Sequence, residues 1–269
     1  MSKSNIAILT TVANFELYKI TSHLFPKGIR KYVIDGTNGM HGIHSIFYMF
    51  KKLSKENIEW LVMADEDVIF NDSDVVFSIV DKMKKEKITV SGVREGGVIK
   101  HREYNPFIVN TFFTIINFKE ILADWNVKEV KKHQYVLPNE FKLDISNLKS
   151  YDINSLYEPY YCFFLWLKRK GKKFQFLDAK MLEDNISNTI IFSNKVFAYH
   201  TWYARSYNEN EKHTKRINKI LNSLDVNISN TSGDINFVMF KDNFFAFKIE
   251  LRKYYKRFIN RLNRKKRNI

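Results

Sequence analysis

The chain has 269 residues, of which 45% are hydrophobic, 15% are aromatic and one is a cysteine, and its net formal charge is +15. The apolar and aromatic content excludes a disordered chain, and the single cysteine excludes a disulfide framework and a cysteine-based zinc site. The length suits one large domain or two small ones with a sizeable buried core.

The sequence lacks the apolar segments that mark export or membrane insertion. Residues 1–5, Met-Ser-Lys-Ser-Asn, lead directly into a short apolar strand pattern, without the longer apolar region of a signal peptide. No stretch reaches the roughly 18 apolar residues of a membrane-spanning helix. We therefore expect a protein of the cytoplasm or of the cytosolic face of a membrane.

The first third of the chain alternates between two hydrophobic patterns. Short apolar runs indicate buried strands, and apolar residues at spacings of three and four indicate helices. Strands that alternate with helices predict an α/β fold with a mostly parallel central sheet flanked by helices. The predicted strands are residues 6–12, 31–34, 60–64 and 88–93, and the predicted helices are 15–24, 43–53 and 75–84.

The middle of the chain is less regular. Residues 109–117 predict a strand and 118–125 a short helix, whereas 131–156 is a polar stretch that we expect to form a long, partly helical excursion. Beyond it we expect a helix at 159–170 that ends at Gly171, and strands at 174–177 and 195–199.

The C-terminal residues carry most of the charge. Residues 241–269 hold eleven lysines and arginines against two acidic residues, a net of +9, so the other 240 residues hold +6. Apolar residues recur there at helical spacing, which predicts an amphipathic basic helix. We expect its apolar face to meet an anionic membrane surface; the alternatives are a helix packed on the body and a nucleic-acid-binding helix. The apolar stripe consists of Phe244, Phe247, Leu251, Tyr254, Tyr255, Phe258 and Leu262.

Two carboxylates one residue apart follow the third predicted strand, in the run Asp65-Glu66-Asp67. Ligands of α/β sheets bind beyond the carboxyl ends of the strands. Asp65 and Asp67 are therefore candidates to hold Mg²⁺ or Mn²⁺, which prefer oxygen ligands and substrate phosphates. The alternative is a solvated turn.

Two further polar groups also stand at strand ends. Asp35, which closes the second strand, can accept hydrogen bonds from a base or ribose, and Gly36 after it lets a ligand approach closely. His200 follows the strand at 195–199 among aromatic residues, and its imidazole can supply another metal ligand. An ordinary turn and a structural histidine are the alternatives.

Taken in chain order, these strands, helices and polar residues resemble the elements of a GT-A-fold glycosyltransferase of the bacterial surface-polysaccharide kind, which makes capsule or O-antigen. The resemblance covers roughly residues 5–210. It rests on the opening strand, Asp35 at the second strand, a DXD motif at Asp65-Glu66-Asp67, Glu158 before an apolar helix, and a late histidine at His200. Two features depart from the family: Thr10-Thr-Val-Ala-Asn14 replaces a Pro-x-Tyr-Asn turn, and Glu158 precedes a proline in place of a Glu-Asp pair.

The resemblance implies a role for each of these groups. It implies that Asp65, Asp67 and His200 bind Mn²⁺ or Mg²⁺ on the donor diphosphate and that Glu158 is the catalytic base. Donor binding is expected from Thr10, Asp35, Gly36, His44, Glu66 and Arg94, and acceptor-side contacts from Trp202 and Arg205. Residues 1–235 would form the glycosyltransferase domain, with 1–117 its nucleotide-binding half and 118–235 its acceptor side, and 236–269 the basic tail.

We expect a metal-dependent transfer of a sugar from a nucleotide diphosphate donor, a UDP-sugar, to a glycan or lipid-linked glycan. A divalent ion stabilises the leaving diphosphate, and a base that deprotonates the acceptor hydroxyl contributes about 10²–10⁴-fold. The enzyme would be peripheral on the inner face of the bacterial cytoplasmic membrane, held by 241–269, and nucleic acid is not an expected partner.

Two other functions compete with this one. A sugar nucleotidyltransferase on a related fold usually has a glycine-rich loop after the first strand, and residues 10–14 contain no glycine. A non-catalytic membrane- or nucleic-acid-binding protein would act through its tail, so deleting 241–269 would abolish all function. The enzyme hypothesis predicts that donor binding and hydrolysis survive that deletion.

Overall fold

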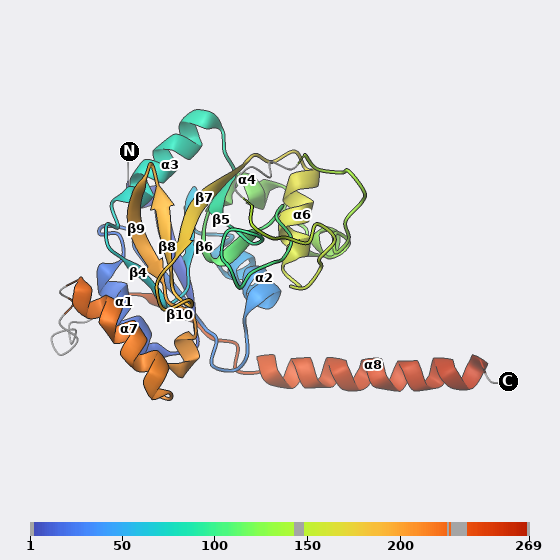
Figure 1. The fold of residues 1–269 in the computed structure, drawn as a ribbon. Coiled ribbons are helices and arrows are strands. Elements are labelled where there is room, and N and C mark those ends of the chain that lie inside the picture. The colour runs from blue at the N-terminus through green and yellow to red at the C-terminus, as the bar shows by residue number, and fades with distance from the viewer. Residues whose placement is uncertain (1–2, 143–147, 225, 227–235, 268–269) are drawn as a thin grey trace.

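The computed structural model describes residues 3–142, 148–224, 226 and 236–267. Within them, ten strands form one sheet in the order β10-β2-β1-β3-β6-β5-β7-β8-β9-β4, with helices on both sides (Figure 1). The predicted α/β class, with a central sheet flanked by helices and a C-terminal helix, is confirmed.

The N-terminal part of the sheet is parallel. The strands β1 (Ile6–Val12), β2 (Arg30–Asp35) and β3 (Trp60–Ala64) run in one direction, because α1 (Phe15–Thr21) and α2 (Gly42–Leu53) provide the crossovers. Each of these strands is buried along most of its length, so both of its faces must be apolar, as the sequence pattern indicated. The short strand β10 (Val238–Phe240) extends this part beside β2, also in parallel.

The second part of the sheet corrects the expectation of mostly parallel pairing. Strand β6 (Val109–Asn117) lies antiparallel between β3 and β5 (Val90–Arg94), and only β7 (Phe174–Met181) continues in parallel beside β5. Strands β8 (Asn188–Phe192), β9 (Lys195–His200) and β4 (Val68–Phe70) then pair antiparallel. Ser193 and Asn194 both have left-handed φ angles of 49° and 62°, which suits a tight hairpin and leaves no room for a crossover helix.

The helices pack the two faces of the sheet. One hydrophobic cluster joins α2, α4 (Phe118–Ala123) and α6 (Tyr161–Arg169) to one face, and a second lies under α3 (Val75–Glu86) on the other. A third, smaller cluster joins α1 and α7 (Glu211–Ser223). The polar excursion at 131–156 overlaps α5 (Val127–Lys131) at its first residue and contains no other helix or strand in its described part; residues 143–147 lie outside the described residues.

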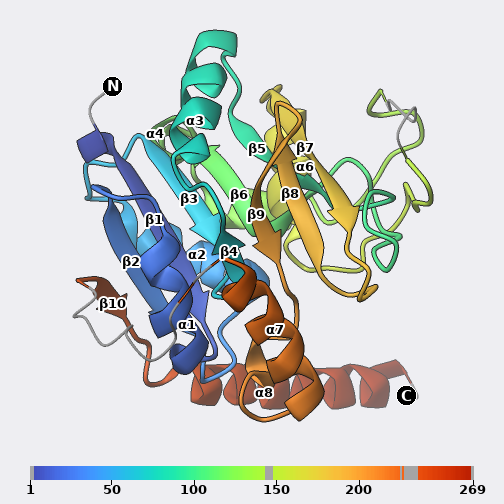
Figure 2. The same ribbon diagram turned by 60° about the vertical axis from the view of Figure 1, so that its left-hand side comes forward.

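The C-terminal helix α8 (Phe245–Arg267) leaves the body as a single helix (Figure 1). Both views place it, together with α7, at the end of the molecule opposite α3 (Figure 2). Among the described residues, no helix is both long enough and apolar enough to cross a bilayer.

Candidate active site

A pocket of about 570 Å³ opens at the carboxyl ends of β1 and β3. The first residues of β6 and the N-terminus of α2 form two further walls. The lining is completed by Arg102, by Glu158 and Tyr160 before α6, by His200 at the end of β9 and by residues 202–206 after it. Polar side chains gather here because strands that are apolar along their length end in loops at this edge.

The three predicted metal ligands lie together in this pocket. Asp65 and Asp67 follow β3, and β4 pairs antiparallel with β9 so that Val68 lies opposite His200. One ligand atom from each of Asp65, Asp67 and His200 lies within 4.8 Å of the others. His200 Nε2 is 3.2 Å from Asp67 Oδ1, and the ring stacks on Phe112 with centroids 3.9 Å apart.

The electrostatics of this group fit a bound divalent cation. Burial raises the pKa of Asp65 well above its ordinary value, the charges of Asp67 and Glu66 add to that rise, and only Arg205 opposes it. Within the described part of the chain, no lysine or arginine forms an ion pair with Asp65 or Asp67, and the buried His200 Nδ1 has no hydrogen-bond partner. Two carboxylates suit Mg²⁺ or Mn²⁺, and imidazole is a ligand that transition ions accept more readily than Mg²⁺ does.

Glu158 lies on the wall formed by the residues before α6, beside a fixed arginine. Its Oε1 is 3.9 Å from Arg102 Nη2, which is 2.8 Å from Glu95 Oε1. Glu95 is fully buried and accepts hydrogen bonds from the hydroxyls of Tyr160 and Tyr161 at 3.1 and 3.2 Å. Burial raises the pKa of Glu95 to about 7, and the charge of Arg102 opposes that rise. This arrangement fixes Arg102 beside Glu158 at the pocket.

Strand register decides which residue of β1 faces the pocket. Thr10 is buried but does not line the pocket, whereas Leu9 and Thr11 do, since successive side chains of a strand point to opposite faces. The hydroxyl of Thr11 is hydrogen-bonded to that of Ser45 on α2. The predicted donor contact at Thr10 is therefore one residue away from the side chain that reaches the pocket.

Glu66 lines the pocket, yet its carboxylate already has protein partners. Its Oε1 accepts hydrogen bonds from the backbone N–H groups of Ala13 and Asn14 at 2.8 and 2.9 Å. Burial raises the pKa of Glu66 to about 7, the charge of Asp67 adds to the rise, and these backbone bonds oppose it. Glu66 thus holds the turn between β1 and α1.

Asp35 and Gly36 lie outside the pocket lining. Asp35 Oδ2 forms an ion pair with Lys241 Nζ at 2.8 Å, and its Oδ1 accepts two hydrogen bonds from Thr37. Burial acts to raise the pKa of Asp35, but the bonds from Lys241 and Thr37 outweigh it and lower that pKa. A Cβ at Gly36 would lie 3.0–3.1 Å from atoms of Thr11, Val12 and Met40. The glycine therefore lets the protein's own backbone approach closely.

His44 and Arg94 are also outside the pocket. His44 makes an edge contact with Phe245, the first residue of α8, with centroids 5.4 Å apart. Arg94 lies over the ring of Phe176 at 3.6 Å and donates a hydrogen bond to the carbonyl of Pro106 at 2.5 Å.

Trp202 and Arg205 line the pocket on a segment with an unusual backbone. Trp202 and Tyr203 have φ angles of 57° and 61°, a left-handed conformation that bulky residues seldom adopt. The indole Nε1 of Trp202 donates to Asn188 Oδ1 at 2.8 Å, and the ring contacts His200 at 4.2 Å. Trp202 therefore lies directly beside a candidate metal ligand.

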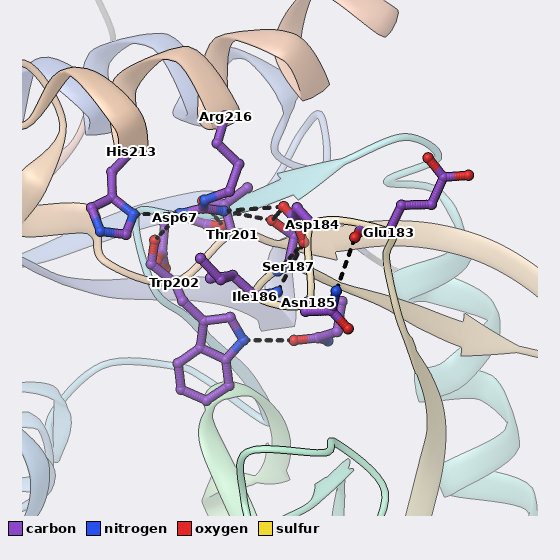
Figure 3. Close-up of polar contacts among 11 residues, drawn as sticks. Asp67, Glu183, Asp184, Asn185, Ile186, Ser187, Thr201, Trp202, His213 and Arg216 are labelled. Carbon is purple, nitrogen blue, oxygen red and sulfur yellow. Dashed lines mark hydrogen bonds and ion pairs between the residues drawn. The ribbon is translucent and has the colours of Figure 1, made fainter.

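Arg216 of α7 binds the backbone of the segment that contains Trp202 (Figure 3). Its guanidinium donates to the carbonyl of Trp202 at 3.0 Å and to Ser187 Oγ at 2.5 Å, and it lies 3.7 Å from Asp184 Oδ2. Next to it, the N–H and the hydroxyl of Thr201 donate to the carbonyl of Asp67 at 3.0 and 3.3 Å. These bonds join the β7–β8 turn and α7 to Asp67 and to the residues that follow His200.

Several residues that line the pocket were not predicted as site residues from the sequence. His41 could have been found from its position just before the first residue of α2, whereas the period of two along β1 does not show whether Thr10 or Thr11 faces the pocket. Burial lowers the pKa of His41, the charge of Arg205 lowers it further, and the charge of Glu158 opposes both. Asn110 carried no signal in the sequence, because only the folded chain brings it here.

Comparison with known proteins finds similarity in structure alone. No protein-family model matches the chain, and no curated protein sequence matches it. One similar structure is a glycosyltransferase involved in the glycosylation of the major capsid of PBCV-1, with 16% identity and a TM-score of 0.32, covering 44% of this chain and 62% of that one.

Two other similar structures are also sugar transferases by description. The mannosyltransferase PcManGT from Pyrobaculum calidifontis, in complex with GDP-Man and Mn²⁺, has 9% identity and a TM-score of 0.28, covering 45% of this chain and 46% of that one. Mouse xyloside xylosyltransferase 1, in its apo form, has 10% identity and a TM-score of 0.35, covering 65% and 85%. The chain spans less than two thirds of the first two structures, so the pocket's own residues have to carry the assignment of activity.

Proposed function

We propose that the protein is a metal-dependent glycosyltransferase of the GT-A type. It moves a sugar from a nucleoside diphosphate donor, a UDP-sugar, to a hydroxyl of an acceptor glycan. The observation that carries the proposal is the group formed by Asp65, Asp67 and His200, which lies in a pocket at the carboxyl edge of the sheet with Glu158 on another wall.

The charges of the pocket support this chemistry. A divalent ion bound by Asp65, Asp67 and His200, Mn²⁺ or Mg²⁺, would supply the Lewis acid that neutralises the leaving diphosphate. Arg205 lines the same pocket and its charge reaches Asp65, so we assign it to the donor phosphates in place of the acceptor. Trp202 presents an aromatic surface for a sugar beside His200.

Glu158 is the base in this proposal. It lines the pocket, and its exposed fraction of 29% leaves the carboxylate accessible to an acceptor hydroxyl. Arg102, anchored by Glu95, lies beside Glu158 and orients it. The proposed donor contacts are now Thr11, His41 and Ser45, in place of Thr10 and His44. The fold around the pocket is supported by Asp35, Gly36, Glu66 and Arg94.

The acceptor proposal comes from the sequence resemblance: a glycan or lipid-linked glycan of bacterial surface polysaccharide, with the enzyme on the inner face of the cytoplasmic membrane. The proposed division into a body at 1–235 and a tail at 236–269 needs one refinement. Residues 238–240 pair with β2, so the tail begins as part of the sheet.

The test is turnover of nucleotide sugars by the purified protein. With Mn²⁺, we expect release of one nucleoside diphosphate from its sugar donor, and we expect none for Asp67→Ala. Glu158→Gln should bind the same nucleotide with unchanged affinity but turn over acceptor about 10²–10⁴-fold more slowly, because only the base is lost. Equal turnover by Glu158→Gln would remove Glu158 from the mechanism, and no turnover of any donor with any divalent metal would refute the function.

A further inference from the structure

Helix α8 exposes a row of large apolar side chains. Six residues in and just before the helix have exposed fractions between 49% and 69%. We call them the aromatic stripe: Phe244, Phe247, Leu251, Tyr254, Tyr255 and Phe258. The side chain of Leu262, which belongs to the same sequence pattern, lies outside the described residues.

The aromatic stripe faces away from the body. At about 100° per residue, its six members fall within an arc of about 100° on the helix, and Phe245 and Ile249 lie on the opposite side. Phe245 is 9% exposed, and both Phe245 and Ile249 belong to the packing around α2 and α6. The stripe is therefore not the part of α8 that packs on the protein, and no described residue covers it.

Cations flank the stripe. Lys248 and Arg252 lie at one border and Arg257 at the other, on the same helical geometry, and residues 241–269 have a net charge of +9. Aromatic side chains beside flexible cations match the interface of an anionic bilayer, where the rings enter the headgroup region and the charges meet lipid phosphates. A soluble protein with an apolar surface would accommodate the aromatic rings but would not neutralise the flanking positive charges.

The start of α8 is fixed to the rim of the pocket. Beside β2, Phe240 stacks on Tyr32 at 5.9 Å, and the next residue, Lys241, forms the ion pair with Asp35. Asn38 donates to the carbonyl of Asp242 at 2.8 Å, after which Phe245 contacts His44. His44 is on the first turn of α2, and the pocket is lined by Gly42 and Ser45 of this helix and by His41 just before it.

We propose that α8 lies lengthwise on an anionic lipid bilayer through the aromatic stripe, and that its attachment at β2 and α2 holds the pocket beside that bilayer. The acceptor is then a membrane-borne glycan, a part of the inference that rests on the proposed function. A helix is about 10 Å across, and Phe245 at the start of α8 contacts His44, the residue next to the pocket-lining Ser45, so the proposal puts the pocket near the lipid headgroups.

Binding to vesicles tests the docking surface. The full-length protein should sediment with vesicles of phosphatidylglycerol and phosphatidylcholine, weakly with phosphatidylcholine alone, and less at high salt. Tyr254→Glu should weaken binding by at least about tenfold, since it places a charge in the apolar stripe. The matched control is Asn260→Glu, which adds the same charge at an exposed position on the far side of the helix and should change binding far less.

Other occupants of the stripe would give different results. A concentration-dependent dimer in sedimentation velocity that Tyr254→Glu dissociates would overturn the proposal in favour of a second copy of the chain. Tight binding to an oligonucleotide without vesicle binding would overturn it in favour of nucleic acid. Equal vesicle binding by Tyr254→Glu and Asn260→Glu would overturn the proposal, because it would show that the net positive charge of the protein alone causes binding and that the aromatic stripe does not enter the bilayer.

Nucleotide binding separates this inference from the proposed function. Tyr254→Glu should keep Mn²⁺-dependent nucleotide affinity and turnover of a water-soluble acceptor, but lose at least about tenfold in rate on an acceptor embedded in vesicles. If the wild-type protein binds vesicles but no nucleotide, the docking surface stands and the proposed function fails. If membrane-embedded and soluble acceptors respond equally to Tyr254→Glu, the membrane-borne acceptor is refuted while the transferase stands.

Discussion

Lys168 of α6 is a cation surrounded by phenylalanine rings. Its Nζ lies 4.5 Å from the ring centroid of Phe174 and 5.5 and 5.6 Å from those of Phe141 and Phe176. Burial lowers the pKa of Lys168 to about 8, and the charge of Arg94 lowers it further. The folded protein therefore releases this proton more readily than the unfolded chain does.

The sign of the pH effect follows from that difference. Below about pH 8, Lys168 is charged in both the folded and the unfolded protein, and burying the charge lowers the free energy of unfolding. Between the folded-state pKa of about 8 and the ordinary pKa of 10.5, the unfolded chain binds more protons than the folded protein, so the free energy of unfolding rises with pH. Lys168→Met should raise the free energy of unfolding at pH 7 by about 1 kcal/mol or more. Urea titrations at pH 7 and pH 9.5 measure this gain, which should shrink at the higher pH; a gain independent of pH would contradict the account.

Single residues show how far sequence reasoning reaches. Asp65, Asp67 and His200 were predicted as one metal group, and the structure brings them together because strand ends meet at one edge of a sheet. Thr10 was predicted as a donor contact, but Thr11 is the residue that lines the pocket; the period of two along β1 separates the two faces of the strand without showing which of them meets the pocket. Asp35 looked like a nucleotide ligand, but its ion-pair partner Lys241 is 206 positions away and enters through β10, which the sequence did not reveal.

At the scale of elements, the segment after β9 is held in a strained form by α7 and the β1–α1 turn. Arg216 binds the carbonyl of Trp202, and Asn14 Nδ2 donates to the carbonyls of Ala204 and Tyr207 at 3.1 and 2.9 Å. Left-handed residues such as Trp202 and Tyr203 cost about 1–3 kcal/mol each and persist only where other contacts enforce them. These contacts therefore fix the side chains that the segment presents to the pocket.

Arg216→Ala should release this segment. Removing the guanidinium leaves the carbonyl of Trp202 and the hydroxyl of Ser187 without this donor, and the backbone at 202–203 can relax. We expect the affinity for nucleotide with Mn²⁺ to fall about tenfold, which is about 1.4 kcal/mol, in calorimetry at a temperature where circular dichroism shows the folded state. Lys215→Ala is the matched control, because Lys215 is 75% exposed on the same helix. Wild-type affinity in Arg216→Ala would contradict the positioning role.

Elements with strong patterns were predictable and short ones were not. The bounds of β1, β3 and β6 match the prediction residue for residue, because each strand is rich in apolar and β-branched residues and is buried along most of its length. Strands β4 and β10 have three residues each, too few for a period, and β8 was missed because its register depends on the hairpin at Ser193 and Asn194. Helix α7 was not predicted because most of its residues are polar and only Ile217, Ile220 and Leu221 are buried.

At the scale of the whole molecule, the tail has two parts with different roles. Residues 238–249 pack on the body, through β10, the Lys241–Asp35 ion pair and the burial of Phe245. Beyond them, the described side chains of α8 are mostly exposed. The sequence predicted the helix and its charge, but not that the chain re-enters the sheet before the helix starts.

Two truncations separate these parts. A chain ending at Glu250 should keep the melting temperature and nucleotide affinity of the full protein, because Phe245 and Ile249 stay packed. A chain ending at Phe237 should lose about 2–4 kcal/mol of unfolding free energy, since it uncovers Tyr32 and removes the buried Phe245. Thermal and urea unfolding measure both; equal stability of the two truncated chains would show that β10 does not support the fold.

Asp65, Asp67 and His200 are proposed to hold a divalent ion for a nucleotide donor. Calorimetric titration of UDP and the other nucleoside diphosphates, with and without Mn²⁺, measures it most directly. We predict that one nucleotide binds only with the metal, that Asp67→Ala abolishes this binding, and that Asp81→Ala, an exposed aspartate on α3, leaves it unchanged. If no nucleotide binds with any divalent metal, or if Asp67→Ala binds as well as the wild type, the proposed site is wrong.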